Sequence, residues 1–214
     1  MQRFVVAITG ASGFMYGVRA VQVLFQAGYE VHVVVSDNAY MVAAKELRLR
    51  FHPNRETVWQ MLVRQPESHP AEGEVTRGKE GRLILHPFRD VSAPIASGSF
   101  ETQGGIIIPA SMGTVGSFAL GLSNNLIERA FDVLLKEGRR IVLVPRETPL
   151  SAIHLEHMLR LARLGVRIVP AMPAFYHRPQ TVEEMVDFVV GKALDALGVP
   201  DIHLFRRWGE EEES

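Results

Sequence analysis

A charged turn follows one of the most apolar runs of this chain. In "PRETP" at 145–149, Arg146 and Glu147 come directly after the run Ile141–Val144. A cation beside a carboxylate at the mouth of a buried strand would suit an anionic ligand, because arginine supplies several donors for oxyanions. A plain surface turn explains the same residues. Both interpretations stay open on this segment alone.

A glycine-containing loop near the start offers a second candidate site. The segment "TGASGFMYG" places Gly10, Gly13 and Gly17 between a strand pattern and a helix pattern. Where side chains are absent, the backbone N–H groups of a helix N-terminus can approach a phosphate. Ser12 could donate to a phosphate or to a flavin ring. The spacing is neither GxGxxG nor a Walker A sequence, so a simple chain turn is the alternative.

A third loop repeats this arrangement after another strand pattern. The segment "PASMGT" at 109–114 offers Ser111, Met112, Thr114 and the amides around Gly113. Taken alone, Ser111 is better explained as a helix cap. Two such loops beyond the ends of neighbouring strands favour a nucleotide ligand.

The remaining charged residues are less informative by themselves. Arg129 and Lys136 are seven residues apart in a helical pattern, which puts them on one face about 10 Å from each other. Such residues usually form a solvated face. The segment "HLEH" at 154–157 is neither HExxH nor HxxEH, and it fits an amphipathic helix. We therefore expect no metal.

Strand and helix patterns alternate along the chain. Short apolar, β-branched runs predict strands at 3–10, 29–36, 82–86, 104–111, 139–145 and 165–170. Helical spacing predicts helices at 15–27, 37–45, 56–64, 117–120, 125–137, 151–164 and 182–197. The polar stretch 65–81 is expected to be an exposed excursion, and the "EEEES" end a solvated tail.

This alternation predicts an α/β fold with a mostly parallel sheet. Nearly all-apolar strands indicate that helices cover both faces of the sheet, giving three layers. The chain is long enough for one domain, 1–214, with a C-terminal tail from about 201. Ligands bind beyond the carboxyl ends of such strands. That rule selects five loops, at 9–17, 35–39, 109–114, 145–149 and 170–179.

Composition excludes several classes of protein. With 23 basic and 24 acidic residues, the net charge of −1 provides no general field for nucleic acid or an anionic membrane. The absence of cysteine removes disulfides, thiolate catalysis and cysteine-ligated zinc. No apolar stretch reaches the roughly 18 residues of a spanning helix, and no signal peptide is evident. We expect a cytoplasmic protein.

Several motifs, taken in order, carry a family resemblance. They are "TGASG", "ASGSF" at 96–100, "PASMGT", "NNLIERAFDVLLKE" at 124–137, "VLVPRETPLSAIHLEHM" at 142–158 and "PAFYHRP" at 173–179. Together they resemble the flavin prenyltransferases of the UbiX type, long named aromatic acid decarboxylases. The resemblance runs from about Phe4 to Trp208 and is weakest across 51–85. Ala110 stands where many members carry cysteine.

The resemblance implies a fold, an activity and partners. The fold would be Rossmann-like, of the flavodoxin type, and would bind FMN. The reaction would join the dimethylallyl group of dimethylallyl monophosphate to N5 and C6 of reduced FMN, with release of phosphate. The product, prenylated FMN, would serve a UbiD-type decarboxylase. The family also implies a homo-oligomer, a dodecamer, with active sites at subunit contacts.

The resemblance also assigns roles to particular residues. It puts Ser12 and Glu46 near flavin N5 and the prenyl group, and Trp208 near the prenyl site. The implied cofactor-binding residues are Gly10, Ala11, Ser12, Ser36, Ser97, Ser111, Met112, Thr114 and Arg146. The implied substrate-phosphate residues are Arg129, Lys136, Glu147, Tyr176 and Lys192. Because adjacent side chains at a strand end point in opposite directions, Arg146 and Glu147 could each face a different substrate.

Two other functions compete with this one. A related flavoprotein decarboxylase acting on a cysteine-containing, peptide-like substrate would share the fold, but such enzymes lack "PRETPL" and "PAFYHRP". A non-catalytic FMN-binding module would explain both glycine-containing loops. It would not explain why the chain also carries the set Arg129, Lys136, Glu147 and Tyr176.

Overall fold

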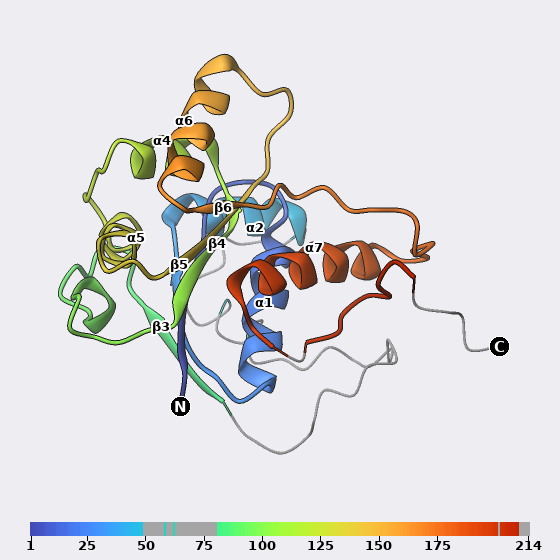
Figure 1. Cartoon of the computed structure of the whole chain (residues 1–214), viewed down its shortest axis with the longest axis horizontal. Helices are drawn as coiled ribbons and strands as arrows, with labels where there is room; N and C mark the ends of the chain where they lie inside the picture. Colours follow the sequence, from blue (N-terminus) through green and yellow to red (C-terminus); the bar gives the residue numbers. More distant parts are fainter. Residues whose placement is uncertain (49–57, 59–61, 63–80, 201, 210–214) are drawn as a thin grey trace.

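A six-stranded parallel sheet forms the centre of the molecule (Figure 1). The computed structural model describes residues 1–48, 58, 62, 81–200 and 202–209. Within these residues the strand order is β3-β2-β1-β4-β5-β6, and every neighbouring pair is parallel. The strands are β1 (Arg3–Ile8), β2 (Glu30–Val35), β3 (Arg82–His86), β4 (Gly104–Ala110), β5 (Arg140–Pro145) and β6 (Arg167–Ile168). The predicted α/β class is confirmed.

Helices cover the sheet on both faces, so the expected three layers are present. The helices are α1 (Phe14–Gln26), α2 (Asp37–Glu46), the 3-10 helix η1 (Pro94–Ala96), α4 (Met112–Ala119), α5 (Leu126–Lys136), α6 (Ala152–Arg163) and α7 (Val182–Leu197). One apolar core joins α1, α2 and α7 to the sheet through residues such as Phe14, Leu24 and Leu194. The other joins α4 and α5 to the opposite face through Phe118 and Phe131.

Most predicted elements are confirmed, with two differences. Helix α4 begins at Met112, earlier than the expected 117, because Ser111 caps it by accepting a hydrogen bond from Thr114 N. Strand β6 has only two residues, although Val169 N still donates to Leu143 O (2.8 Å). The expected helix at 56–64 and the polar stretch 65–81 lie almost wholly outside the described residues; Val58 and Leu62 are buried and helical.

Helix starts gather at the carboxyl edge of the sheet, which matters for ligand binding. Ser36, Ser111, Asn125, Ser151 and Thr181 each accept a hydrogen bond from a backbone N–H of the helix that follows. These are the side chains that satisfy free helix amides best. The positive ends of α2 and α4 therefore open toward the loops at the carboxyl edge.

The segment 202–209 packs partly on α7. Leu204 is buried, and Phe205 lies so close to Gly191 that a side chain there would collide with its ring. Arg207 Nη2 lies 2.9 Å from Asp195 Oδ1. Across the described parts of the chain, no helix combines the length and apolar character needed to cross a bilayer.

Candidate active site

A buried threonine ties together the two central strands where they end. Thr9 Oγ1 donates to Pro109 O at 2.8 Å and accepts from Ser111 N at 2.8 Å. Thr9 is only 1% exposed, so these bonds form in a dry environment. Thr9 was not among the residues predicted from the sequence, although its place directly before Gly10 at a strand end was a signal. Thr9 sets the distance between the loops after β1 and β4.

A cavity of about 180 Å³ opens between these loops. Its lining is mainly hydroxyls, glycines and amides: Gly10, Ser36, Asn38, Phe88, Ser111, Gly113, Thr114, Ser117, Asn125, Ile127 and Glu128. Ser36 Oγ accepts from Ala39 N, and Ser111 Oγ lies 3.0 Å from Thr114 Oγ1. Capping by Ser111 is thus confirmed. A capping hydroxyl still keeps a proton to donate, so the cavity can bind an anion at two helix N-termini.

The glycine-containing loop differs from expectation at its helix end. Gly13 N donates to Glu46 Oε1 (2.8 Å) and Phe14 N donates to Glu46 Oε2 (3.0 Å). A carboxylate of the chain itself therefore occupies the anion position at the start of α1. These two amides are therefore paired within the chain, which favours the simple chain turn over phosphate binding at this helix end. Gly13 has φ +99°, a conformation that explains the glycine without a ligand.

Arg146 and Glu147 lie at the carboxyl edge but in different surroundings. Arg146 N donates to Ala110 O, which joins the turn to the end of β4. Its Nε is buried and has no hydrogen-bond partner among the described residues. Glu147 is exposed and accepts from Thr148 N at 3.0 Å. A buried unpaired guanidinium donor requires a partner, and an anionic or carbonyl group of a ligand would supply one.

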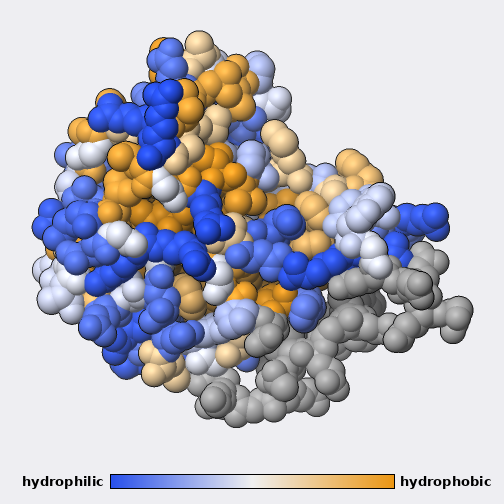
Figure 2. All heavy atoms as spheres, in the orientation of Figure 1, coloured by the Kyte–Doolittle hydropathy of each residue, from blue (hydrophilic) through white to orange (hydrophobic). Residues whose placement is uncertain are grey.

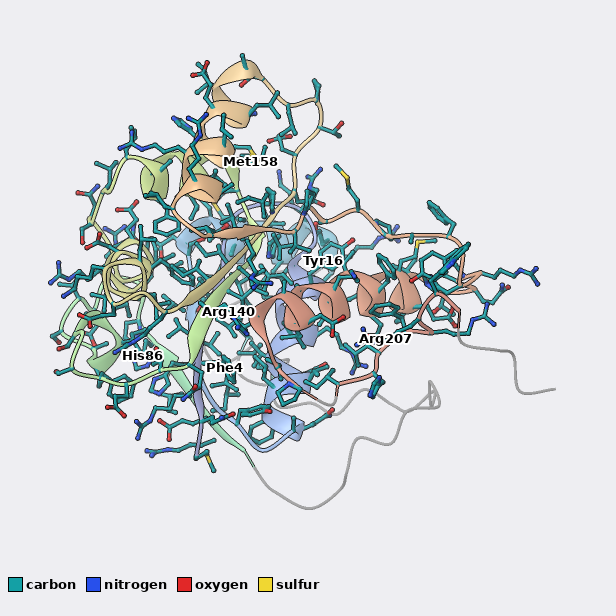
Figure 3. The ribbon with its side chains drawn as sticks, viewed as in Figure 1. Phe4, Tyr16, His86, Arg140, Met158 and Arg207 are labelled. Atoms are coloured by element: carbon teal, nitrogen blue, oxygen red, sulfur yellow. The ribbon has the colours of Figure 1, made fainter. Side chains whose placement is uncertain are left out.

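Tyr16 is a neighbour of this region that the sequence analysis did not select. Burial raises the pKa of Tyr16, the charge of Arg146 lowers it and the charge of Glu46 raises it. The phenol, the guanidinium and the carboxylate are therefore close enough to interact. Figure 3 shows Tyr16 at the end of α1 that lies nearest the carboxyl edge. Its ring also fills the space beside Gly13.

Ser97 and Lys136 form a second cluster at the opposite edge of the sheet. Lys136 ends α5, directly before the chain enters β5 at Arg140. A side chain at Gly98 would meet Lys136 Nζ and the Glu137 carboxylate, so the loop at Ser97 lies against the end of α5. Both predicted residues are exposed, and Lys136 Nζ pairs with Glu137 Oε1 at 3.1 Å. This cluster is separate from the cavity in one chain.

The remaining predicted residues occupy other places. Tyr176 and Trp208 make an edge-to-face contact with ring centroids 5.3 Å apart, and Tyr176 also contacts Phe188 of α7. Trp208 is 82% exposed, so the described residues leave its ring largely uncovered. Ala11 and Met112 are buried near the cavity loops, whereas Ser12, Arg129 and Lys192 are exposed on their respective elements.

Comparison with known proteins identifies the family. The statistical model of the flavoprotein family matches residues 1–194. The flavin prenyltransferase UbiX of Halalkalibacterium halodurans is 47% identical over 211 residues, covering 99% of this chain and 95% of the relative. The chain belongs to the UbiX flavin prenyltransferases, within the flavoprotein family.

Solved UbiX structures share the whole fold. The crystal structure of AnUbiX (PadA1) in complex with FMN and dimethylallyl pyrophosphate matches with a TM-score of 0.81 and 36% identity, covering 99% of each chain. A dodecameric FMN-dependent UbiX-like decarboxylase from Escherichia coli O157:H7 matches with a TM-score of 0.80 and 40% identity. The alignment covers 98% of this chain and 100% of the Escherichia coli chain. The predicted flavodoxin-like fold is thereby confirmed.

In this UbiX family member, the groups suited to bind a phosphorylated cofactor lie together at the carboxyl edge, whereas the charged residues Lys136 and Glu147 lie far apart. The cavity and Arg146 offer neutral donors and one cation for a phosphorylated cofactor. Lys136 and Glu147 stand at opposite ends of β5, which is about 20 Å long at the usual rise per residue. In the described residues no three His, Asp or Glu side chains come together as a metal site.

Proposed function

We propose that this protein is a flavin prenyltransferase that forms prenylated FMN from reduced FMN and dimethylallyl monophosphate. The similarity to UbiX relatives over nearly the whole chain carries the proposal. AnUbiX, with the same fold, has been crystallised with FMN and a dimethylallyl diphosphate ester. The dimethylallyl group is joined to N5 and C6 of the flavin, and phosphate leaves.

The residues at the carboxyl edge fit a bound FMN. The proposed contacts at this edge are Gly10, Ala11, Ser12, Ser36, Ser111, Met112, Thr114 and Arg146. Ser97, which lies at the opposite edge of the sheet, would contact FMN from a neighbouring chain. The unpaired Nε of Arg146 and the hydroxyls at two helix N-termini supply donors for phosphate and carbonyl oxygens. Reduced FMN supplies the nucleophilic N5 and C6. The 180 Å³ cavity is smaller than the roughly 300–1,000 Å³ typical of small-molecule sites, so the described residues of one chain enclose only part of a flavin.

A second chain would complete the site. Lys136 and Glu147, both assigned to the substrate phosphate, cannot meet within one chain across the length of β5. Exposed apolar residues on α6 and at its C-cap provide a surface for such an assembly: Ile153, Leu155, Leu159 and Leu164. Figure 2 shows hydrophobic side chains reaching the surface where α6 lies, at the top of the view. We propose a homo-oligomer like the dodecameric relative, and sedimentation as a monomer at micromolar concentration would contradict it.

In that assembly the charged residues act on the leaving group. Arg129, Lys136 and Lys192 would offset the negative charge that develops on the departing phosphate. Glu147 would handle a proton, while Ser12 and Glu46 lie toward the reacting edge of the flavin. Tyr176 and Trp208 present aromatic faces, which attract the cationic character of an ionising allyl group.

The cellular role follows from the product. Prenylated FMN would be delivered to a UbiD-type decarboxylase in the cytoplasm, and ubiquinone biosynthesis is one pathway that such a pair would serve. The protein itself would then be no decarboxylase, although the Escherichia coli relative carries that description.

One anaerobic experiment tests the proposal against its rivals. Purified protein is given FMN, dithionite and dimethylallyl monophosphate, and the flavin is analysed by mass spectrometry. We expect the mass of FMN to increase by one dimethylallyl unit without added metal. FMN that binds but stays unmodified would favour a binding module. In a parallel sample, oxidised FMN and a cysteine-terminated peptide replace dithionite and the prenyl donor, and loss of carbon dioxide from the peptide would favour the related decarboxylase.

A further inference from the structure

Arg139 holds the loop that carries Ser97, and we propose that it is a positioning residue for the flavin site. Arg139 Nη2 donates to Gly98 O at 2.7 Å, and Nη1 donates to Phe100 O at 2.7 Å and to Thr102 Oγ1 at 3.3 Å. One planar guanidinium thus donates hydrogen bonds to every second residue of the loop: Gly98, Phe100 and Thr102. The proposal rests on the proposed function, because Ser97 is assigned there to FMN.

The backbone of Arg139 is itself fixed. Gly138 has φ +65°, and Arg139 N donates to Leu134 O at 2.9 Å, which closes the end of α5. Arg139 therefore starts from the same helix end that carries Lys136. Its side chain sets the distance between that helix end and the Ser97 loop.

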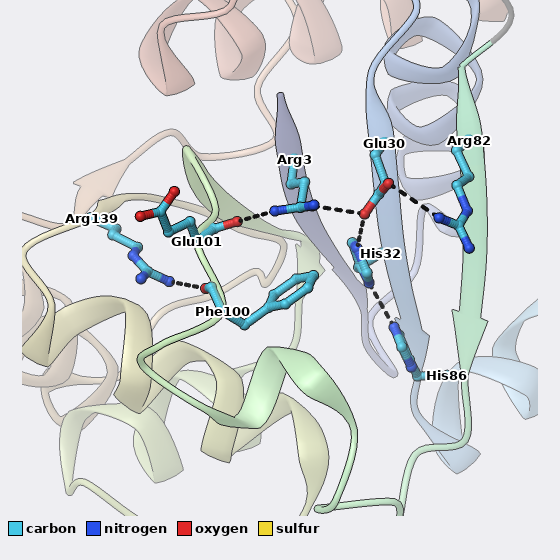
Figure 4. A network of polar contacts seen from close by, with 8 residues as sticks. All are labelled: Arg3, Glu30, His32, Arg82, His86, Phe100, Glu101 and Arg139. Atoms are coloured by element: carbon cyan, nitrogen blue, oxygen red, sulfur yellow. Dashed lines mark hydrogen bonds and ion pairs between the residues drawn. The ribbon is translucent and has the colours of Figure 1, made fainter. Parts of the chain in front are cut away.

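A second arginine holds the same loop from the other side (Figure 4). Arg3 Nη1 donates to Glu101 O at 3.4 Å, and its guanidinium lies 4.9 Å from the centre of the Phe100 ring. Arg3 is in turn paired with Glu30 at 2.9 Å. The loop is thus anchored to α5 on one side and to the first two strands on the other.

The anchored loop displays polar groups that its own chain leaves exposed. Ser97 Oγ lies 2.9 Å from Ser99 Oγ, and both residues are exposed beside the Lys136 ammonium. A loop of small residues would lose this arrangement readily without such anchors, because ordering it costs backbone entropy. Arg139 donates its hydrogen bonds to two carbonyls and a hydroxyl of the loop and not to a ligand. It can therefore act on FMN only through Ser97 and its neighbours.

The test is a double-mutant cycle on FMN affinity with Arg139→Lys and Ser97→Ala. Lysine keeps the charge but cannot bridge two carbonyls in a fixed fork. We expect Arg139→Lys to raise the Kd of FMN about five- to tenfold, and the double variant to bind no more weakly than Ser97→Ala alone. Arg140→Lys is the matched control. The Arg140 side chain bonds Leu197 O at 3.1 Å, on the α7 side, and FMN affinity should not change.

Gly98→Ala tests the same position without touching the arginine. Its new methyl group would meet the end of the exposed Glu137 side chain, which can turn aside, so FMN affinity should stay close to that of the wild type while Arg139 keeps the loop in place. Additive effects of Arg139→Lys and Ser97→Ala would overturn the proposal, as would wild-type FMN affinity in Arg139→Lys or equal losses in Arg140→Lys. The FMN titration needs no prenyl donor. Failure of the prenylation assay would therefore reject the proposed function, whereas the positioning role of Arg139 is decided by the FMN titration alone.

Discussion

The cavity at the carboxyl edge and the Ser97–Lys136 cluster are built by different means. In the cavity, Ser36, Ser111 and Thr114 are held by helix caps within three residues of themselves. In the Ser97–Lys136 cluster, the loop is held by arginines from distant parts of the chain. Local caps thus orient the hydroxyls of the cavity, whose loops are spaced by the long-range bonds of Thr9. In the Ser97–Lys136 cluster, long-range contacts hold the loop itself.

This difference bears on what each region does. Caps leave little freedom, so the cavity is preorganised to bind before any reaction takes place. Lys136 is more than half exposed and pairs only with the neighbouring Glu137 in the described contacts of its side chain. An exposed ammonium contributes little until water is excluded around it. We therefore expect the cavity to dominate FMN affinity and the exposed charges to dominate the rate.

The largest effect should come from the exposed charges. Lys136→Ala and Glu147→Gln should each slow prenyl transfer by about 2–4 kcal/mol in activation free energy, because contacts that strengthen with developing charge are lost. FMN should remain bound. Single-turnover rates and FMN titrations measure the two quantities separately. Lys45→Ala and Glu183→Gln serve as exposed controls, and wild-type rates in both test variants would remove these residues from the phosphate site.

A smaller effect is expected at the cavity, and on binding instead of rate. Arg146→Met should weaken FMN binding by about 1.5–3 kcal/mol, the range for hydrogen bonds to charged groups. Methionine fills similar space without leaving an unpaired buried donor. Fluorescence titration measures the loss, with the exposed Arg167→Met as the control. An unchanged Kd would show that Arg146 does not contact the flavin. It would also contradict the expectation that the carboxyl-edge region dominates FMN affinity and the exposed charges dominate the rate.

Trp208 belongs to neither region, and its substitution should have a still smaller effect. Trp208→Leu removes an aromatic face worth about 0.5–2 kcal/mol toward a cation and keeps much of the apolar cover. We expect a slower prenylation rate with unchanged assembly and FMN affinity. Phe175→Leu, another exposed aromatic, is the control. If only assembly or thermal stability changes, Trp208 is a packing residue between subunits.

The smallest effect concerns stability beside the Ser97 loop. Burial lowers the pKa of His32, opposed by its hydrogen bond to Glu30; Arg3 and Arg82 lower it further. His86 Nε2 lies 2.8 Å from His32 Nδ1, and Phe100 packs on the His32 ring. Because the folded pKa lies below the unfolded value near 6.5, protonation favours unfolding. The stability that neutral His32 provides is present above about pH 6.5 and is lost as pH falls toward the folded pKa.

Thermal unfolding midpoints at about pH 7.5 and about pH 5.5 measure this loss. The pKa of Glu30 is also lowered, since hydrogen bonds from His32 and Arg3 outweigh the effect of burial, so its contribution is lost in the same direction at more acidic pH. His32→Gln keeps a donor for Glu30 and should show a smaller drop between the two pH values. The exposed His203→Gln should behave like the wild type. An identical drop in His32→Gln would exclude His32 as the cause.

Much of the fold follows from patterns within short segments. Strands β1, β2, β4 and β5 were predictable because each is a nearly continuous apolar run bounded by glycine, proline or polar residues. Parallel strands place their carboxyl ends at one edge, so the loops with Ser36, Ser111 and Arg146 had to meet there. The capping role of Ser111 was likewise readable from its residue type.

Tertiary structure decided which hydrogen-bond donors are paired within the chain and which remain available to a ligand. No local pattern links Glu46 to Gly13, which is 33 residues earlier, yet this carboxylate accepts a hydrogen bond from the Gly13 amide, which the sequence offered as one possible phosphate contact. Thr9, Tyr16 and Arg139 gained their roles only through partners far along the chain. The separation of Lys136 from Glu147 depends on the direction of α5 and the length of β5. Residue types determine what chemistry is possible, whereas long-range packing determines which donors are already paired and which remain for a ligand.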